Sequence, residues 1–255
     1  MLSKHSLVNV GERLDDLEYG GFKIIQNPSL YCFTSDAVLL ANMVICGSRD
    51  TVCDLGTGSG IIATIIATKF NAKKVYGIEI QPCMADMAKR SVMYNDLEEK
   101  IEIINTSIQN AVSVLGKGNM SRVVCNPPYQ KLGAGEKQLK EELAICRHEV
   151  AVTLEEIVKT ASELLQFAGR FYIIHQAKRL AELIFLLEKY NLKVKKINLI
   201  QPKADKNVDT VIVEAVKNGK DGVVIPPPII VNNSDNTLSD TVKGMYKKEW
   251  QVHYI

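Results

Sequence analysis

Apolar segments with the length of buried strands recur along the chain after residue 50. Each is four or five residues long and contains valine or isoleucine, which favour extended backbone. We expect strands at 51–55, 75–79, 101–104, 122–125 and 171–174. Because segments with helical signals lie between several of them, the pattern predicts a doubly wound α/β sheet.

Two of the expected helices have recognisable N-terminal signals. Pro82 suits the first position of a helix, and Thr153 with Glu156 forms a capping-box pattern. We expect the helix that follows Thr153 to end near Gly169, since glycine is common just after a helix. The helix that begins at Pro82 should reach about residue 94, and the other expected helices of the core span 61–69 and 179–190.

Two last strands, near 195–200 and 210–216, are joined by a segment without room for a helix. Such a connection predicts an antiparallel pair. The whole pattern therefore predicts a seven-stranded, mostly parallel sheet with one antiparallel strand.

The chain is expected to form a single domain, 1–255, with three parts. An N-terminal cap, 1–50, should contain a strand at 22–26 and a helix through 37–43 that Ser35 or Asp36 caps. The sheet and its helices would occupy 51–220. A tail, 221–255, follows and contains Pro226-Pro227-Pro228.

Composition and charge exclude several classes of protein. Hydrophobic residues at 46% and charged residues at 24% are ordinary for a globular chain, and the net charge of +2 is too small for a general polyanion-coating protein. The six cysteines contain no Cys-x-x-Cys pair, which favours reduced thiols, and no histidine spacing indicates a metal site. Neither a membrane span nor a secretory leader is visible, so we expect a cytoplasmic protein.

A glycine-rich loop follows the first strand of the core, in the order Asp54-Leu55-Gly56-Thr57-Gly58-Ser59-Gly60. Glycines there let the backbone approach a ligand closely. Glu79 ends the next strand, nineteen positions after Gly60, where a carboxylate can accept ribose hydroxyls. A dinucleotide loop would need a small residue at Ile61, so NAD binding and a plain strand-to-helix turn are the weaker alternatives.

The tetrapeptide Asn126-Pro127-Pro128-Tyr129 follows the fourth strand of the core. Two prolines keep the backbone extended and remove two donors, which leaves carbonyl groups available as acceptors. The Asn126 side chain and the Pro127 carbonyl can bind the two hydrogens of a planar amino group, and Tyr129 can stack on a flipped base. A rigid proline turn is the structural alternative.

Cys125 immediately precedes this motif. It is a candidate nucleophile, because enzymes that methylate a pyrimidine carbon can use a cysteine in that role. Its place on the strand itself favours a buried structural thiol instead.

The glycine loop resembles motif I of class I S-adenosylmethionine-dependent methyltransferases, and Asn-Pro-Pro-Tyr resembles motif IV of N-methyltransferases. Three further segments extend the resemblance along nearly the whole chain: 11–17 (GERLDDL), 33–40 (FTSDAVLL) and 147–149 (RHE). Together they are similar to the bacterial tRNA1(Val) (adenine-37-N6)-methyltransferase family. The resemblance implies a Rossmann-like fold, S-adenosylmethionine as cofactor and an RNA substrate, with methylation at N6 of adenine 37 in tRNA1(Val).

The resemblance also assigns site residues. The catalytic residues would be Asn126, Pro127 and Tyr129. The cofactor would be bound by Asp54, Gly56, Thr57, Gly58, Gly60, Glu79, Ile80, Ser107, Ile108, Asn126, Thr34 and Asp36. For Asp36, a role as helix N-cap is an equal alternative.

Ser107 departs from the family pattern, which usually has an aspartate there for the adenine amino group of the cofactor. A neutral acceptor should hold that amino group less firmly. RNA contacts are less defined: the eight lysines from Lys189 to Lys220 suit either phosphate contacts or a solvated face. The segment 130–149 suits either a substrate lid or a mixed-charge loop.

Other functions remain as alternatives. A protein glutamine N5-methyltransferase or a guanine-N2 rRNA methyltransferase shares the motif, although the glutamine enzymes carry a helical domain before motif I. A DNA adenine methyltransferase would need a target-recognition domain, for which no stretch is left over. A non-catalytic binding protein would explain Ser107. We expect a monomer with no membrane association.

Overall fold

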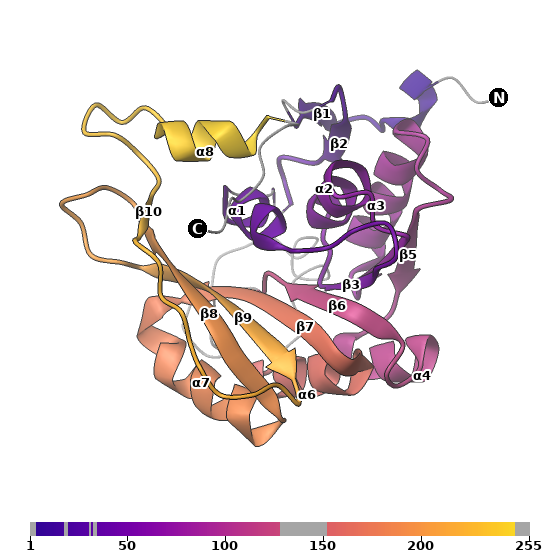
Figure 1. Cartoon of the computed structure of the whole chain (residues 1–255). Coiled ribbons are helices and arrows are strands. Elements are labelled where there is room, and N and C mark those ends of the chain that lie inside the picture. The colour runs from indigo at the N-terminus through magenta and orange to yellow at the C-terminus, as the bar shows by residue number, and fades with distance from the viewer. Residues whose placement is uncertain (1–3, 18–19, 31, 33–34, 128–151, 248–255) are drawn as a thin grey trace, which may run out of the picture.

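The computed structural model describes residues 4–17, 20–30, 32, 35–127 and 152–247. A central sheet of eight strands has helices on both faces (Figure 1). In spatial order the strands are β10 (Ile229–Ile230), β8 (Leu192–Gln201), β9 (Thr210–Lys217), β7 (Leu165–Gln176), β6 (Met120–Cys125), β3 (Thr51–Leu55), β4 (Lys74–Glu79) and β5 (Ile101–Asn105).

Strand β9 is antiparallel to both of its neighbours, β7 and β8, and the other pairs of neighbours in this sheet are parallel. The prediction of a mostly parallel sheet with one antiparallel strand is therefore confirmed. The predicted number of strands was one too low, because the tail adds the two-residue strand β10 beside β8.

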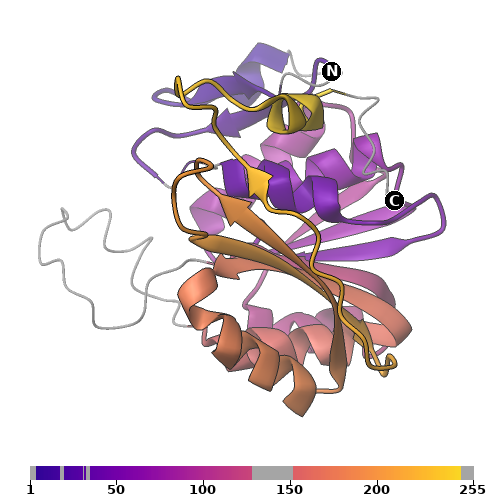
Figure 2. The same ribbon diagram turned by 60° about the vertical axis from the view of Figure 1, so that its left-hand side comes forward.

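Helices cover both faces of the sheet, which explains why its strands are apolar almost throughout. Alternate residues of one strand enter different clusters: Val52 packs in one core and Cys53 in the other, as do Val124 and Val123. The first core lies under α1 (Ser35–Met43), α2 (Ile61–Lys69) and α3 (Pro82–Tyr94); the second lies under α4 (Ala111–Leu115), α6 (Leu154–Leu164) and α7 (Leu180–Lys189) (Figure 2).

The predicted helices α2 and α3 have their expected bounds, and Thr153 and Glu156 form the predicted capping box at α6. The predicted end of α6 near Gly169 is wrong. The helix ends at Leu164, because Leu165 already pairs with Met120 of β6. Gly169 serves a close approach instead: a Cβ there would lie 3.0 Å from the carbonyl oxygen of Gln166.

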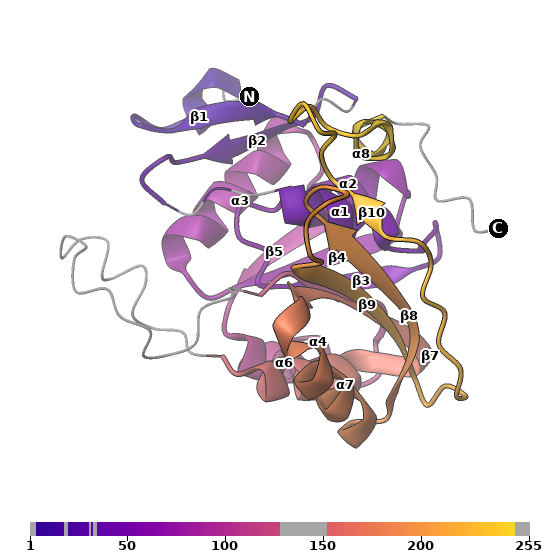
Figure 3. The same cartoon turned by 90° about the vertical axis from the view of Figure 1, so that its left-hand side faces the viewer.

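Within the N-terminal cap, a short hairpin packs against α3 (Figure 3). Its strands are β1 (Arg13–Asp16), which the sequence pattern did not predict, and β2 (Lys23–Gln26). The backbone N–H of Ile25 donates to Ser91 Oγ at 3.0 Å, and that of Lys23 donates to Asn95 Oδ1 at 3.0 Å. The side chains of α3 thus satisfy backbone groups of β2.

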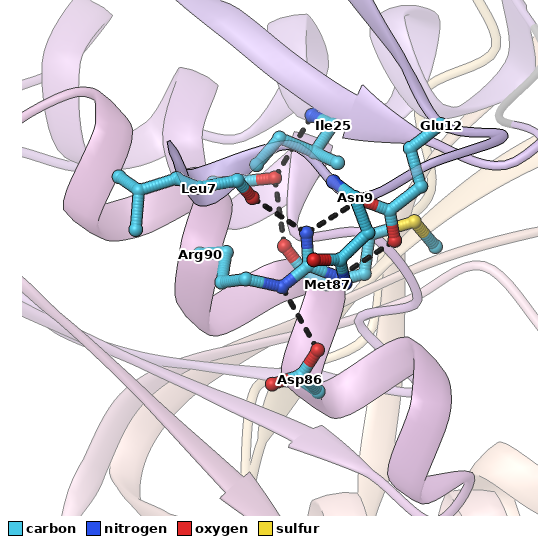
Figure 4. A network of polar contacts seen from close by, with 8 residues as sticks. Leu7, Asn9, Glu12, Ile25, Asp86, Met87 and Arg90 are labelled. Carbon is cyan, nitrogen blue, oxygen red and sulfur yellow. Dashed lines mark hydrogen bonds and ion pairs between the residues drawn. The ribbon is translucent and has the colours of Figure 1, made fainter. Parts of the chain in front are cut away.

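A partly buried ion pair attaches the segment ahead of β1 to the same helix (Figure 4). Arg90 donates to both carboxylate oxygens of Glu12, at 2.5 and 2.7 Å, and to the carbonyl oxygen of Leu7 at 2.7 Å. Burial alone would raise the pKa of Glu12, but hydrogen bonds from Arg90 and from the Asn9 N–H lower it overall. The charged form of Glu12 is therefore the one that the fold stabilises.

The tail after β10 returns to the N-terminal side of the molecule, where α8 (Asp240–Met245) packs on α1. Lys69 of α2 donates to the Met245 carbonyl oxygen at 2.8 Å and to Asn42 Oδ1 of α1. A cation at this carbonyl lies at the C-terminal end of α8, where it is favoured by the helix dipole. The described part of the tail, up to residue 247, is thus a structured part of the fold.

We expect Arg90→Met to lower the free energy of unfolding by about 2 kcal/mol, because the partly buried Glu12 carboxylate would lose its charge-assisted hydrogen bonds. Asp86→Ala is the matched control: Asp86 also binds Arg90, but its side chain is 62% exposed, so the expected loss is within about 0.5 kcal/mol. Because the pKa of Glu12 is lowered in the fold, its contribution is present above the unfolded pKa and is lost as pH falls through the folded one. Urea denaturation at pH 7 and pH 4 measures both effects, and equal losses for the two variants would contradict this account.

Candidate functional site

The predicted site residues come together because four parallel strands end at the same edge of the sheet. The registers Leu55↔Ile78, Leu55↔Cys125 and Glu79↔Asn105 align the carboxyl ends of β3, β4, β5 and β6. In open α/β sheets, ligands bind outside these ends. The glycine loop, Glu79, Ser107 and Asn126 each follow or end one of the four strands.

The glycine loop is held against the end of β4 by backbone hydrogen bonds. The N–H groups of Gly56 and Thr57 both donate to the carbonyl oxygen of Ile78, each at 2.9 Å. Gly58 and Gly60 have φ values of +58° and +88°, in the left-handed region that glycine adopts without strain. The loop therefore requires glycine at these two positions for its conformation.

Gly77 on β4 is a further glycine that the loop requires. A Cβ there would lie 2.9 Å from Thr57 Cγ2 and 2.7 Å from Ile103 Cδ1. The missing side chain leaves space for Thr57, whose hydroxyl donates to Asp54 Oδ2 at 2.6 Å. Glycine is needed at this position because residues distant in sequence, Thr57 and Ile103, approach it closely. The local sequence around Gly77 therefore gave no signal for it.

Asp54 is fully buried beneath the loop. Its Oδ2 accepts from Thr57, whereas its Oδ1 is buried without a hydrogen-bond partner among the described residues. Burial is the main cause that raises the pKa of Asp54 to about 7, and the nearby charge of Glu79 adds to it. A buried carboxylate with an unsatisfied oxygen suits a cationic group of a ligand.

Glu79 ends β4 and holds the loop with its carboxylate. Its two oxygens accept from the N–H groups of Gly58 and Gln81, each at 2.9 Å. Burial raises the pKa of Glu79, and hydrogen bonds from the backbone of Gln81, Gly58 and Ile80 oppose that shift. Glu79 is thus both a candidate acceptor for ribose hydroxyls, as predicted, and part of the support of the glycine loop.

Asn105 is a supporting residue that the sequence analysis did not single out. Its amide donates to the carbonyl oxygens of Glu79 and Ile80, at 2.8 and 2.9 Å, and so joins the ends of β5 and β4. Ser107 caps the short 3-10 helix η2 (Ile108–Asn110), with its Oγ accepting from the Asn110 N–H at 3.3 Å. Ser107 therefore has a structural role, and Ile108 is the first residue of η2.

Asn126 and Pro127 directly follow β6, at the same edge as the glycine loop. Tyr129 and Thr34, which were also predicted as site residues, lie outside the described residues. Asp36 lies in the first turn of α1, so it is helical rather than the N-cap. Cys125 is buried, and burial, with smaller effects of Asp54 and Cys53, raises the pKa of its thiol. That environment does not favour a thiolate nucleophile.

The lysines between Lys189 and Lys220 are largely engaged within the protein. Lys193 pairs with Glu188 and Asp221, Lys189 pairs with Glu155, and Lys195 donates to backbone carbonyl oxygens. These lysines thus make local contacts within the fold, and their role in phosphate binding stays a prediction. Within the described part of the chain, no group of three or more His, Cys, Asp or Glu residues is arranged to hold a metal ion.

The two carboxylates of this site fit S-adenosylmethionine. The buried carboxylate of Asp54 suits a cationic group of that molecule, and the strand-end carboxylate of Glu79 suits the hydroxyls of its ribose. The left-handed glycines leave the loop backbone open to close approach. Gly56, Thr57, Gly58, Gly60, Ile80 and Ile108 would line the cofactor through their backbone or side chains.

The fold is shared with solved methyltransferases. A predicted O-methyltransferase from Agrobacterium tumefaciens superimposes with a TM-score of 0.67, at 22% identity over 83% of this chain and 95% of that one. A geranyl diphosphate C-methyltransferase from Streptomyces coelicolor, in complex with S-adenosyl-L-homocysteine, has a TM-score of 0.53 at 13% identity, over 71% of this chain and 76% of that one. The fold is thus that of the class I methyltransferases.

Residues 34–201 match the model of the methyltransferase small domain, and the chain belongs to this family. It is a methyltransferase whose cofactor is S-adenosylmethionine. It is also similar to the tRNA1(Val) (adenine(37)-N6)-methyltransferase of Porphyromonas gingivalis, with 32% identity over 184 residues, 70% of this chain and 71% of the relative. None of the helices in the described part of the chain has the length and apolar character needed to cross a bilayer.

We expect Asp54→Asn to make the fold less sensitive to pH. The raised pKa of Asp54, about 7 in the fold, means that its contribution to stability is present below its unfolded pKa and is lost as pH rises through 7. Asparagine stays neutral, so the variant should gain up to about 4 kcal/mol over wild type at pH 8 and little at pH 4. Denaturant unfolding at both pH values tests this, and a gain that does not change with pH would contradict it.

Glu79→Ala should weaken S-adenosylmethionine binding by about 2 kcal/mol, because it removes an acceptor for the cofactor and the partner of the Gly58 N–H. Glu102→Ala is the matched control, since Glu102 is exposed on the neighbouring strand β5. Isothermal calorimetry gives both dissociation constants. An unchanged constant for Glu79→Ala would reject this role.

Proposed function

We propose that the chain methylates the N6 amino group of an adenine in tRNA, and that its target is adenine 37 of tRNA1(Val). The observation that carries the reaction class is the position of Asn126-Pro127 at the carboxyl end of β6, beside the glycine loop. The similarity to the tRNA1(Val) (adenine(37)-N6)-methyltransferase of Porphyromonas gingivalis supports the choice of substrate.

Asn126 and Pro127 would orient the amino group of the adenine. The lone pair of that nitrogen is delocalised into the ring, so it must become more tetrahedral before it can attack a methyl group. The Asn126 side chain and the Pro127 carbonyl oxygen would accept its two hydrogens and stabilise the developing positive charge. Tyr129, outside the described residues, would stack on the flipped base.

The bound cofactor supplies an activated methyl group on a sulfonium, which leaves as a neutral thioether. The chain needs no strong general base for this transfer, because the methylated nitrogen becomes very acidic. It also needs no thiolate, which agrees with the buried state of Cys125. The residues of the chain therefore bind the cofactor, orient the amino group and stabilise the positive charge that develops on it.

The remaining assignments follow from the same proposal. We propose a single cytoplasmic domain, 1–255, that acts as a monomer on an RNA partner without membrane association. The described residues ahead of β3 form a 3-10 turn, the β1–β2 hairpin and α1, which does not favour the helical domain of glutamine N5-methyltransferases. A guanine-N2 activity on rRNA is an outcome that the product analysis below distinguishes.

Asn126→Ala should lower the rate of methyl transfer by about 100-fold or more, the scale seen when one transition-state hydrogen-bonding group is removed. Its affinity for the cofactor should change much less. Cys125→Ser should retain most of the activity, because no covalent enzyme intermediate forms. Single-turnover transfer of labelled methyl to unmodified tRNA, followed by nucleoside identification, measures all three proteins.

The expected product is N6-methyladenosine from wild type and Cys125→Ser, and almost none from Asn126→Ala. Full activity in Asn126→Ala would show that the motif is only a turn. A 5-methylpyrimidine product that disappears in Cys125→Ser would overturn the mechanism.

A further inference from the structure

We propose that Gln26, on β2 of the N-terminal cap, is a positioning residue for the cofactor loop. Its buried amide holds Ser59, which lies between Gly58 and Gly60, and thereby keeps the loop in the conformation that binds S-adenosylmethionine. The proposal concerns the cofactor site and does not depend on which substrate receives the methyl group.

A direct contact joins the cap to the loop. Gln26 Nε2 donates to Ser59 Oγ at 3.4 Å, across a sequence separation of 33 residues. Both residues are buried, with exposed fractions of 1% for Gln26 and 4% for Ser59. Gln26 is therefore too enclosed to contact a ligand at the surface, and it acts on the cofactor through Ser59.

A polar residue at position 26 interrupts the apolar pattern of β2. Ile24 and Gln26 are two residues apart in the strand, so their side chains lie on the same face. Ile24 is part of the first core, under α1, α2 and α3. Burying an amide costs free energy unless it is hydrogen-bonded, whereas an apolar side chain at this place would add to the core. The contact with Ser59 provides an acceptor for the amide nitrogen of Gln26.

The position of Gln26 is fixed by the docking of the cap on α3. Its neighbour Ile25 donates through its N–H to Ser91 Oγ, and the Ile25 side chain packs with Met84 and Met87. The Arg90–Glu12 pair fastens the segment ahead of β1 to the same helix (Figure 4). Since α3 begins three residues after Glu79, the cap, the helix and the loop form one support for the cofactor.

The glycine loop needs contacts that fix its backbone. Gly58 and Gly60, on either side of Ser59, both have positive φ, and glycine has more backbone freedom than other residues. Their N–H groups are held by Glu79 and by the carbonyl oxygen of Thr57. The Ser59 side chain is the group through which the cap reaches this flexible stretch.

The test is a double-mutant cycle with Gln26→Met, Ser59→Ala and the double variant. Methionine keeps the length of glutamine and removes its hydrogen-bonding groups. Arg13→Ala is the control within the same hairpin, because the Arg13 side chain forms an exposed ion pair with Asp15, two residues further along β1. The readouts are the dissociation constant for S-adenosylmethionine, amide hydrogen exchange of residues 56–60 in the ligand-free protein, and the single-turnover rate at saturating cofactor.

We expect Gln26→Met to raise the dissociation constant about tenfold and to speed exchange of the loop amides, as the loss of one buried hydrogen bond predicts. The double variant should bind no worse than the weaker single variant, since both changes remove the same contact. The rate at saturating cofactor should stay within about twofold of wild type, and Arg13→Ala should match wild type throughout.

Three results would overturn the proposal. One is an unchanged dissociation constant together with unchanged amide exchange, even if the melting temperature falls, because Gln26 would then serve stability alone. Another is fully additive effects of the two substitutions. The third is a slower rate at saturating cofactor with normal binding. A failure of tRNA methylation with these binding results intact would count against the proposed substrate and leave this inference standing.

Discussion

The binding site depends on the hydrogen bonds that attach the glycine loop to the end of β4. Two loop amides share the carbonyl oxygen of Ile78, and a third donates to the carboxylate of Glu79. Parallel pairing of β3 with β4 places that carbonyl and carboxylate beside the loop. The buried Asp54 and the space left by Gly77 complete the arrangement. The same groups that bind a cofactor therefore also determine the shape of their own loop.

The cap extends this dependence beyond the core of the sheet. Residues far apart in sequence, at the start of the chain and in α3, meet in a partly buried polar network that contains the Arg90–Glu12 pair (Figure 4). The bidentate contact of Arg90 with Glu12 fixes the position of the segment ahead of β1 on α3. The geometry that it supports is the approach of β2 to the glycine loop. The tail makes a similar attachment through Lys69, which joins α2 to α1 and to the end of α8.

Much of the fold was predictable because local signals and tertiary structure agree. The bounds of α2 and α3 follow from the glycine loop and from Pro82, and the antiparallel strand β9 follows from the missing connecting helix. The end of α6 was mispredicted because pairing of Leu165 with Met120 overrides the glycine signal at Gly169. The strand β10 is two residues long and depends wholly on its neighbour β8, so no local pattern indicates it.

The residues of the site likewise include some that the sequence predicts and some that it does not. Asp54, Glu79 and Asn126 occupy strand ends, so their proximity follows from parallel topology once the strands are known. Gln26, Gly77 and Asn105 are supporting residues whose importance lies in contacts with distant parts of the chain. Ser107 was expected to contact the adenine of the cofactor, and the structure gives its side chain a further role as the cap of η2.

The central claim is that this chain methylates the N6 nitrogen of a tRNA adenine. The most direct test is nucleoside mass spectrometry of tRNA and rRNA from a strain that lacks the gene, and from the same strain with the gene restored. We expect N6-methyladenosine to disappear from tRNA1(Val) in the deletion strain and to return on restoration. Unchanged N6-methyladenosine in that tRNA, with loss of 2-methylguanosine from rRNA or of methylglutamine from a protein, would contradict it.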